Sequence, residues 1–205
     1  MPTQRFEGLQ EYKKKKIGEA VIDEFQRTSY GELHISKIAR RAQVSRGSLY
    51  TYFQDKEDMF LFALNESWKA ILDCNKRSLS ENGGDFWEMI ISSLQYHMGM
   101  CKSNQIYRLL YLASENAVVP YEALFSRKRE EEYQKYKEWV YEHIDRSCLK
   151  NYSKEEFSVL QDTCQSLLMV SVQMYLHGNS PEETVKKDFR AKLMQIKKGV
   201  CLSGN

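Results

Sequence analysis

The sequence predicts an all-α protein in which a small helix-turn-helix domain of three helices precedes a larger helical domain. The 205 residues include only 3 Pro and 10 Gly, so few positions interrupt regular structure. Apolar residues make up 42% of the chain, with 13 Tyr and 9 Phe among them, which is enough for a packed core. Apolar residues also recur at helical spacing between the turn signals. We therefore expect one domain over residues 1–56 and a second over residues 57–205.

The first predicted helix runs from Tyr12 to Arg27 and includes a cluster of basic residues. Residues 1–56 hold 11 Lys or Arg against 7 Asp or Glu, and four consecutive lysines, Lys13 to Lys16, concentrate this excess. Such a run is typical either of a solvated helix face or of an arm that contacts phosphates. After the helix, Gly31 predicts a left-handed turn. The apolar stripe of the helix consists of Ile17, Ala20, Val21, Ile22 and Phe25.

The second and third helices are predicted at Ile35–Ala42 and from Arg46 to Phe53. Only three residues join them, and the last of these, Ser45, has a hydroxyl that can cap the third helix. Two helices joined by a tight turn, the second short and polar on its outer side, have helix-turn-helix geometry. In that geometry the first turn of the third predicted helix, which begins at Arg46, enters the major groove of DNA. The Arg46 side chain could there bind guanine or a phosphate.

Residues 35–60, ISKIARRAQVSRGSLYTYFQDKEDMF, resemble the DNA-binding signature of the TetR family of bacterial transcription regulators. With the preceding helix, the resemblance covers about residues 12–62. Gln43 stands where the family usually has Gly, so a residue with a side chain must adopt a strained conformation in the turn. Leu33 and His34 replace the Thr or Ser that commonly starts the second helix. The matching positions are Ile38-Ala39, Ala42, Val44-Ser45, Gly47-Ser48-Leu49-Tyr50, Tyr52-Phe53 and Lys56-Glu57.

This resemblance implies that the protein binds a double-stranded DNA operator. The positions for which it implies base contacts are Arg46, Gly47, Ser48 and Tyr50. It implies phosphate contacts at Tyr52 and Lys56, and we expect two more at Lys14 and Thr51. For the two tyrosines, half-buried packing is the structural alternative. A helix-turn-helix that packs against another protein is the functional alternative, and its exposed face would be more apolar than this one.

Six helices are predicted in the rest of the chain. A fourth helix begins after a capping Asp55. Asp85 can cap the fifth, which is apolar nearly all round and is therefore expected to be buried. Ser153 and Glu156 form a capping box before the eighth, and Pro181 is expected at the first position of the ninth. These helices run from Lys56 to Leu79, from Phe86 to Cys101, from Gln105 to Ala117, from Tyr121 to Cys148, from Lys154 to His177 and from Glu182 to Lys198.

The last two predicted helices carry more apolar surface than a monomer needs, which favours a two-fold dimer interface. The resemblance implies a homodimer through these helices, from Lys154 to His177 and from Glu182 to Lys198, whereas burial within one subunit is the alternative. It also implies that the fifth helix lines a pocket for a small, largely apolar inducer, although core packing explains most of the same residues. The candidate pocket residues are Trp68, Trp87, Ile91, Leu94, Gln95, Met98, Tyr107, Tyr111, Tyr136 and Trp139.

Other classes of protein lack their signals in the sequence. The first residues have no apolar stretch after their charges, and no segment is apolar enough to span a membrane, so we expect a cytoplasmic protein. The five Cys and four His show no metal-binding spacing, and neither a nucleophile motif nor a phosphate-binding glycine loop is present. We therefore expect no enzyme, no cofactor and no metal. The resemblance to the TetR family implies instead a ligand-responsive repressor.

Overall fold

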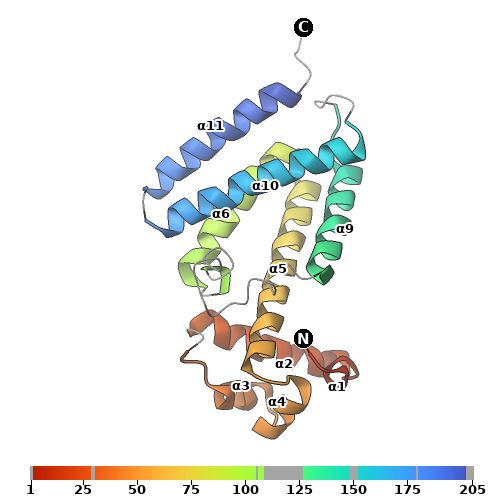
Figure 1. Cartoon of the computed structure of the whole chain (residues 1–205), viewed down its shortest axis with the longest axis vertical. Helices are drawn as coiled ribbons and strands as arrows, with labels where there is room; N and C mark the ends of the chain where they lie inside the picture. The colour runs from red at the N-terminus through yellow and green to blue at the C-terminus, as the bar shows by residue number, and fades with distance from the viewer. Residues whose placement is uncertain are drawn as a thin grey trace. The chain divides into compact units, whose positions relative to one another are not determined.

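The computed structural model describes residues 2–28, 31–104, 106–108, 127–147, 152–178 and 180–201. Every regular element in these ranges is a helix, which confirms the predicted all-α class (Figure 1). The chain divides into two compact units, the first formed by Met1–Ala70 and Cys101–Leu124 and the second by Ile71–Met100 and Phe125–Asn205.

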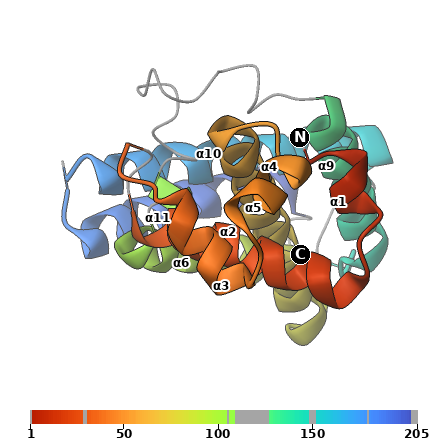
Figure 2. The same ribbon diagram turned by 90° about the horizontal axis from the view of Figure 1, so that it is seen from below.

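Unit 1 contains α1 (Gln4–Glu7), α2 (Glu11–Arg27), α3 (Ile35–Ala42) and α4 (Arg46–Tyr52), together with the first part of α5 (Lys56–Glu81) (Figures 1 and 2). The bounds of α2, α3 and α4 agree with the predicted helices to within one residue.

The short helix α1 was not predicted, because four residues are too few to show helical periodicity. It is held in place by Phe6, which is 2% exposed and lies 5.2 Å from the ring of Phe53. Thr3 adds two hydrogen bonds, since its N–H donates to the Tyr52 carbonyl and its hydroxyl donates to the Thr51 carbonyl. The N-terminal segment is thus attached to the end of α4.

The core of unit 1 extends beyond the predicted domain boundary after residue 56. Helix α5 contributes four fully buried side chains to this core, which also receives the apolar faces of α2, α3 and α4. The division between compact units therefore falls inside α5, after Ala70, and α6 (Phe86–Ser103) also has residues in both units. The predicted functional boundary after residue 56, between the helix-turn-helix domain and the larger helical domain, stays a prediction. The four buried residues of α5 are Met59, Phe60, Ala63 and Leu64.

The turn between α3 and α4 has the strained backbone that the sequence predicts. Gln43 has φ 56° and ψ 43°, and it is the only described residue other than glycine with a positive φ. Its backbone N–H donates to the carbonyls of Ala39 and Arg40, and its side-chain oxygen accepts a hydrogen bond from Lys16. The expectation of a left-handed Gly31 was wrong, because α2 ends instead at an extended Thr28 (φ −126°, ψ 147°).

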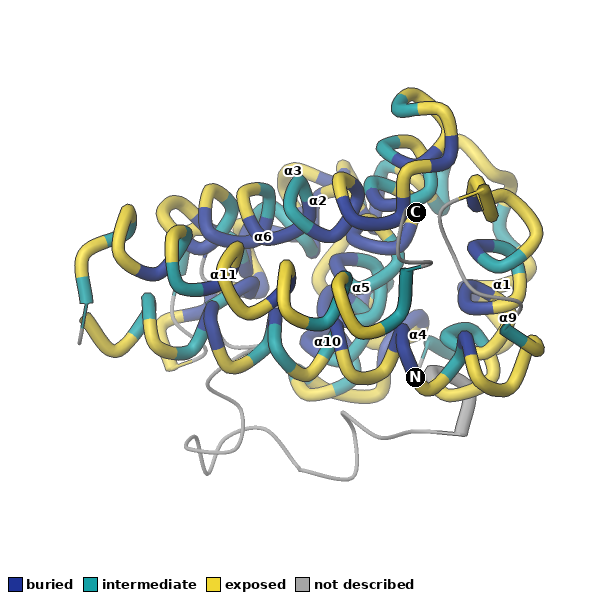
Figure 3. The backbone as a smooth tube through the Cα atoms, turned by 90° about the horizontal axis from the view of Figure 1, so that it is seen from above, coloured by how far each residue is buried: buried dark blue, intermediate teal, exposed yellow. Residues whose placement is uncertain are grey.

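Unit 2 contains the rest of α5 and α6, with α9 (Arg127–His143), α10 (Lys154–Leu176) and α11 (Glu182–Val200). Buried residues recur along α10 and α11, and exposed residues alternate with them (Figure 3). The helix expected from Tyr121 to Cys148 is shorter at its end, since it stops at His143; residues 121–126 and 148 lie outside the described ranges. Of the helix expected from Gln105 to Ala117, only residues 106–108 are described, and they are helical.

Helix α6 was predicted to be buried on all sides, but one of its sides is exposed. Glu88, Gln95, Gly99 and Lys102 are exposed, and their spacing of seven, four and three residues places them on one side of the helix. The opposite side holds Leu94, which is 2% exposed, among other buried residues. The expectation that this helix is buried on all sides was therefore wrong. No helix in the described part is long and apolar enough to cross a membrane.

Candidate nucleic-acid interface

Helix α4 has a buried side and an exposed polar side. Leu49 is fully buried in unit 1, whereas Arg46, Gly47 and Tyr50 are exposed and Ser48 is half-buried. The helix starts where the sequence predicts, because the Ser48 N–H donates to the Ser45 hydroxyl oxygen at 3.0 Å. All four residues predicted to contact bases therefore lie on the short capped helix, and none of them is buried.

Gly47 has no packing reason to be glycine. A Cβ atom at this position would meet only the Ser45 Oγ, at 3.8 Å, which is an ordinary contact. Glycine in an exposed helix costs about 1 kcal/mol relative to alanine, so the fold would be more stable with a larger residue here. Glycine at this position leaves the surface of α4 open to the close approach of another molecule.

Arg46 and Tyr50 form an adjacent pair on the exposed side of α4. The guanidinium carbon of Arg46 lies 6.0 Å from the centre of the Tyr50 ring, and 41% of Tyr50 is exposed. At this distance the cation–π attraction orients the arginine without removing its N–H donors from solvent. The pair offers five N–H donors and one phenol, the groups that bind base edges and phosphates.

The four residues predicted to contact phosphates are less uniform. Tyr52 is 8% exposed and its ring meets Phe6 edge to face at 6.3 Å, so the packing alternative holds for the ring. The Thr51 hydroxyl donates to the Ser48 carbonyl at 2.7 Å and would have to rotate to donate to a phosphate. Lys56 is half-buried at the first position of α5. Their phosphate contacts stay predictions.

Lys14, the fourth of these residues, is already engaged with two carboxylates. Its ammonium lies 3.0 Å from Glu11 and 3.7 Å from Glu7. The hydrogen bond to Glu11, followed by the charges of both carboxylates, raises the pKa of Lys14 above its ordinary value. A phosphate contact would have to replace these ion pairs, which the sequence interpretation did not foresee.

Arg40 is a candidate that the sequence interpretation missed. It is exposed in the last turn of α3, and it has no ion-pair partner in the described part of the chain. Its neighbour Arg41 pairs with Asp23, and Lys37 lies 3.9 Å from Glu24. The sequence signal that could have identified it is the pair of arginines, Arg40 and Arg41, just before the turn. The sequence alone does not show that only Arg41 forms an ion pair.

The predicted inducer-pocket residues fall in both units. Trp68 and Tyr107 belong to unit 1, where the Tyr107 hydroxyl donates to the Ser67 carbonyl at 3.4 Å. Tyr111 lies outside the described residues. The other seven belong to unit 2, and their burial varies: Trp87, Leu94, Met98 and Tyr136 are buried, Ile91 and Trp139 are half-buried, and Gln95 is exposed. Because Gln95 is exposed, its amide can hydrogen-bond to water.

Two polar side chains are buried on α6. Ser93 is 2% exposed and its hydroxyl has no hydrogen-bond partner among the described residues. His97 is 1% exposed, and burial lowers its pKa to about 3, so the ring is neutral at pH 7. Burial also raises the pKa of the Tyr136 phenol to about 12. The interior of unit 2 therefore holds neutral polar groups.

The described residues contain little that suggests catalysis. They include no group of three or more His, Cys, Asp or Glu side chains that could hold a metal ion. Burial raises the pKa of the Cys101 and Cys164 thiols to about 12, so neither forms the thiolate that a nucleophile requires. Cys148 is outside the described ranges.

Comparison with known proteins gives two family matches. Residues 17–62 match the family described as "Bacterial regulatory proteins, tetR family", and residues 85–200 match "Tetracyclin repressor-like, C-terminal domain". The first match covers α3, α4 and most of α2. The second covers α6, α9, α10 and α11, the described helices between residues 85 and 200.

Several solved structures share the fold at low sequence identity. A TetR transcriptional regulator from Rhodococcus sp. RHA1 is 14% identical, with a TM-score of 0.60 over 94% of this chain and 96% of the other. FadR from Bacillus subtilis, in complex with stearoyl-CoA, is 13% identical, with a TM-score of 0.57 over 91% and 98%. RolR in complex with resorcinol is 15% identical, with a TM-score of 0.58 over 96% and 89%.

Proposed function

The chain belongs to the tetR family of bacterial regulatory proteins, and from this membership we propose that it is a cytoplasmic repressor released by a small inducer. It binds a pseudo-palindromic DNA operator as a homodimer and carries out no catalysis. The observation that carries this proposal is the exposed side of α4, which presents Arg46, Gly47, Ser48 and Tyr50 on a helix whose other side is buried. A face that docks onto protein would be more apolar.

In this proposal the first turn of α4 lies in the major groove. Arg46 donates two N–H groups to a guanine edge, and Gly47 lets the helix approach the base pairs closely. Ser48 and Tyr50 supply hydroxyls to neighbouring base edges. Phosphates are held by Lys56, Lys14, Tyr52 and Thr51 from the elements that flank the groove.

We expect Arg46→Ala and Lys56→Ala to weaken DNA binding in different ways. Loss of the Arg46 base contact should cost about 1–3 kcal/mol at one operator position and relax the preference there. Loss of Lys56 should weaken binding to all sequences alike and reduce the dependence on salt by about one phosphate contact. Binding-site selection and fluorescence anisotropy at several salt concentrations measure both effects. An unchanged consensus for Arg46→Ala would refute its assignment.

The inducer in this proposal is small and largely apolar, with one polar group. Buried apolar residues around α6 in unit 2 favour an apolar ligand, and the Ser93 hydroxyl without a described partner favours a polar group on it. FadR and RolR, which share the fold, have been solved with stearoyl-CoA and resorcinol. A ligand releases DNA only if it binds the state with lower operator affinity more tightly.

We expect compounds that raise the melting temperature of the protein to lower its operator affinity roughly 5–150-fold, the range of a typical allosteric coupling. The measurement is a DNA titration with and without each compound, and Ser93→Ala is the variant that should weaken both effects together. Compounds that bind tightly but leave the operator affinity unchanged would show that the interior of unit 2 does not control DNA binding.

A further inference from the structure

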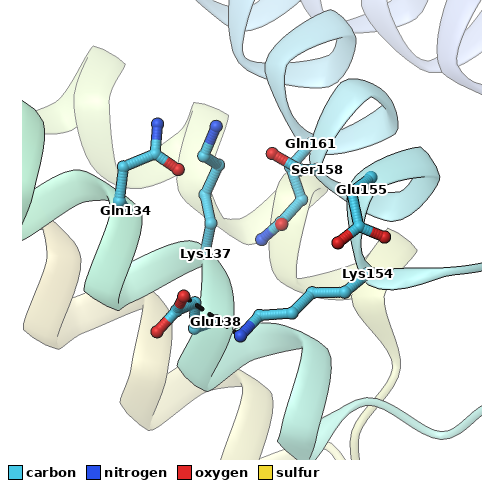
Figure 4. Close-up of a pocket in the computed structure, with 7 residues that line it drawn as sticks. All are labelled: Gln134, Lys137, Glu138, Lys154, Glu155, Ser158 and Gln161. Carbon is cyan, nitrogen blue, oxygen red and sulfur yellow. Dashed lines mark ion pairs between the residues drawn. The ribbon is translucent and has the colours of Figure 1, made fainter.

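Unit 2 has a pocket between α9 and α10 that none of the predicted inducer residues lines. It has a volume of about 240 Å³ and is partly open to solvent. Helix α9 forms one wall and the first turns of α10 form the other (Figure 4). Its seven lining residues are all polar or charged: Gln134, Lys137, Glu138, Lys154, Glu155, Ser158 and Gln161.

Gln161 contributes a buried, unsatisfied acceptor to this pocket. The residue is 5% exposed, and its side-chain oxygen has no hydrogen-bond partner in the described part of the chain. Buried acceptors of this kind are rare, because loss of hydration without a replacement hydrogen bond is unfavourable. Since Gln161 lines the pocket, a donor placed there can supply the missing hydrogen bond.

The two lysines of the pocket are both neutralised by carboxylates. Lys137 is 5% exposed, and its ammonium lies 3.1 and 3.0 Å from the two carboxylate oxygens of Asp162. The Lys154 ammonium lies 3.0 Å from Glu138 (dashed line in Figure 4). Neither cation is therefore available to attract an anion, and a bound carboxylate would have to displace an existing pair.

The lining groups that are left over are the Ser158 hydroxyl, the amides of Gln134 and Gln161 and the Glu155 carboxylate, and only the carboxylate is charged. The Glu155 carboxylate has no ion-pair partner among the described residues. Gln134 donates one amide N–H to Glu130 at 2.6 Å, which leaves its carbonyl oxygen and its second N–H. With Asp162 included, the three carboxylates outnumber the two lysines, so the pocket has a net negative charge. The unsatisfied Gln161 oxygen and the unpaired negative charge together favour a ligand with N–H donors and a positive charge.

We propose that the α9–α10 pocket is a binding site for a small organic cation with several N–H donors, of the class of short alkyl diamines. One ammonium donates to the buried Gln161 oxygen, and the other is attracted by the Glu155 carboxylate at the rim. The volume is below that of sites for drug-sized ligands, which limits the occupant to a few heavy atoms. This site does not depend on DNA binding or on the inducer.

Isothermal titration calorimetry with 1,4-diaminobutane on the full chain tests the proposal. We expect saturable binding that Gln161→Leu and Glu155→Gln each weaken roughly tenfold, the loss of one hydrogen bond or attraction to a charged group. Glu88→Gln is the matched control, because it neutralises an exposed carboxylate in the first turn of α6, away from the pocket. Its affinity should equal that of the wild type.

Two comparison ligands separate charge from shape. Succinate has the opposite charge at a similar length, and 1,4-butanediol has donors without charge; neither should bind at concentrations that saturate with the diamine. Gln161→Leu should keep the wild-type melting temperature or raise it, because it removes a buried acceptor that lacks a partner. The proposal is overturned if the diamine gives no saturable heat, if succinate binds more tightly, or if both pocket variants bind the diamine as the wild type does.

Discussion

We expect Gly84→Ala to lower the free energy of unfolding by about 3 kcal/mol, from backbone strain and a steric clash together. Gly84 has φ +88°, a region that residues with a Cβ atom rarely adopt. A Cβ atom here would lie 2.7 Å from the Asp145 backbone nitrogen and 2.9 Å from the His143 carbonyl oxygen. Both are backbone atoms at the end of α9, so neither can move as a flexible side chain could.

A backbone hydrogen bond also joins Gly84 to the residues that follow α9. The Asp145 N–H donates to the Gly84 carbonyl at 2.9 Å, so any shift that relieves the clash also lengthens this bond. Gly83→Ala is the matched control, because φ is +72° there but no atom lies within 4 Å of the added carbon. It should cost only about 1 kcal/mol. Urea unfolding followed by circular dichroism measures both variants, and equal losses would show that the close contact is unimportant.

The positions of helix starts could be predicted because each depends on a few neighbouring residues. Asp85 accepts hydrogen bonds from the N–H groups of Trp87 and Glu88 at 2.8 and 3.0 Å, as its place before an apolar run indicates. The capping box of Ser153 and Glu156 is likewise present. Pro181 is a small exception, since it is the residue before α11 and not its first position.

What could not be predicted depends on contacts between distant residues. The close approach of Gly84 to the end of α9 joins segments 60 residues apart, and the sequence around Gly84 reads only as a linker. Tyr50 and Tyr52 are indistinguishable by residue type, yet 41% of one and 8% of the other is exposed, because Phe6 of the unpredicted α1 covers Tyr52. The exposed residues of α4 that could contact DNA were thus predictable as a set. Which cations lack an ion-pair partner, as Arg40 does among the described residues, was not predictable.

The pocket between α9 and α10 was also outside the reach of the sequence. Its seven lining residues are polar or charged, as is usual for the surface of two long helices. Lysine in particular is a residue type that the sequence predicts to be exposed. Only the pairing of the two helices shows that Lys137 and Gln161 are buried. Burial turns an unremarkable amide into an acceptor without a described partner, which is a property of the packing.

The second large effect that we expect is the loss of operator binding in a protein that cannot dimerise. Helix α10 has three exposed apolar residues on one side, Val159, Val170 and Met174, which are 65%, 52% and 36% exposed. Their spacing of eleven and four residues keeps them on one face of the helix. On α11, Met194 is 49% exposed. These side chains are a surface that a second copy of the chain would cover in the proposed dimer.

We expect the double variant Val170→Glu, Met194→Glu to be monomeric and to bind the operator at least 100-fold more weakly than the wild type. Across a two-fold axis each new carboxylate meets its own symmetry mate or its neighbour, so both charges repel and lose hydration at once. A monomer can contact only one half-site and loses the second set of contacts. Light scattering should give about 24 kDa for the variant, the mass of one chain, and twice this mass for the wild type.

Ser80→Glu adds a carboxylate to an exposed position of α5 and should leave the mass and the affinity unchanged. A dimeric double variant would place the interface elsewhere, and a monomeric wild type, with and without DNA, would remove the basis for a pseudo-palindromic operator.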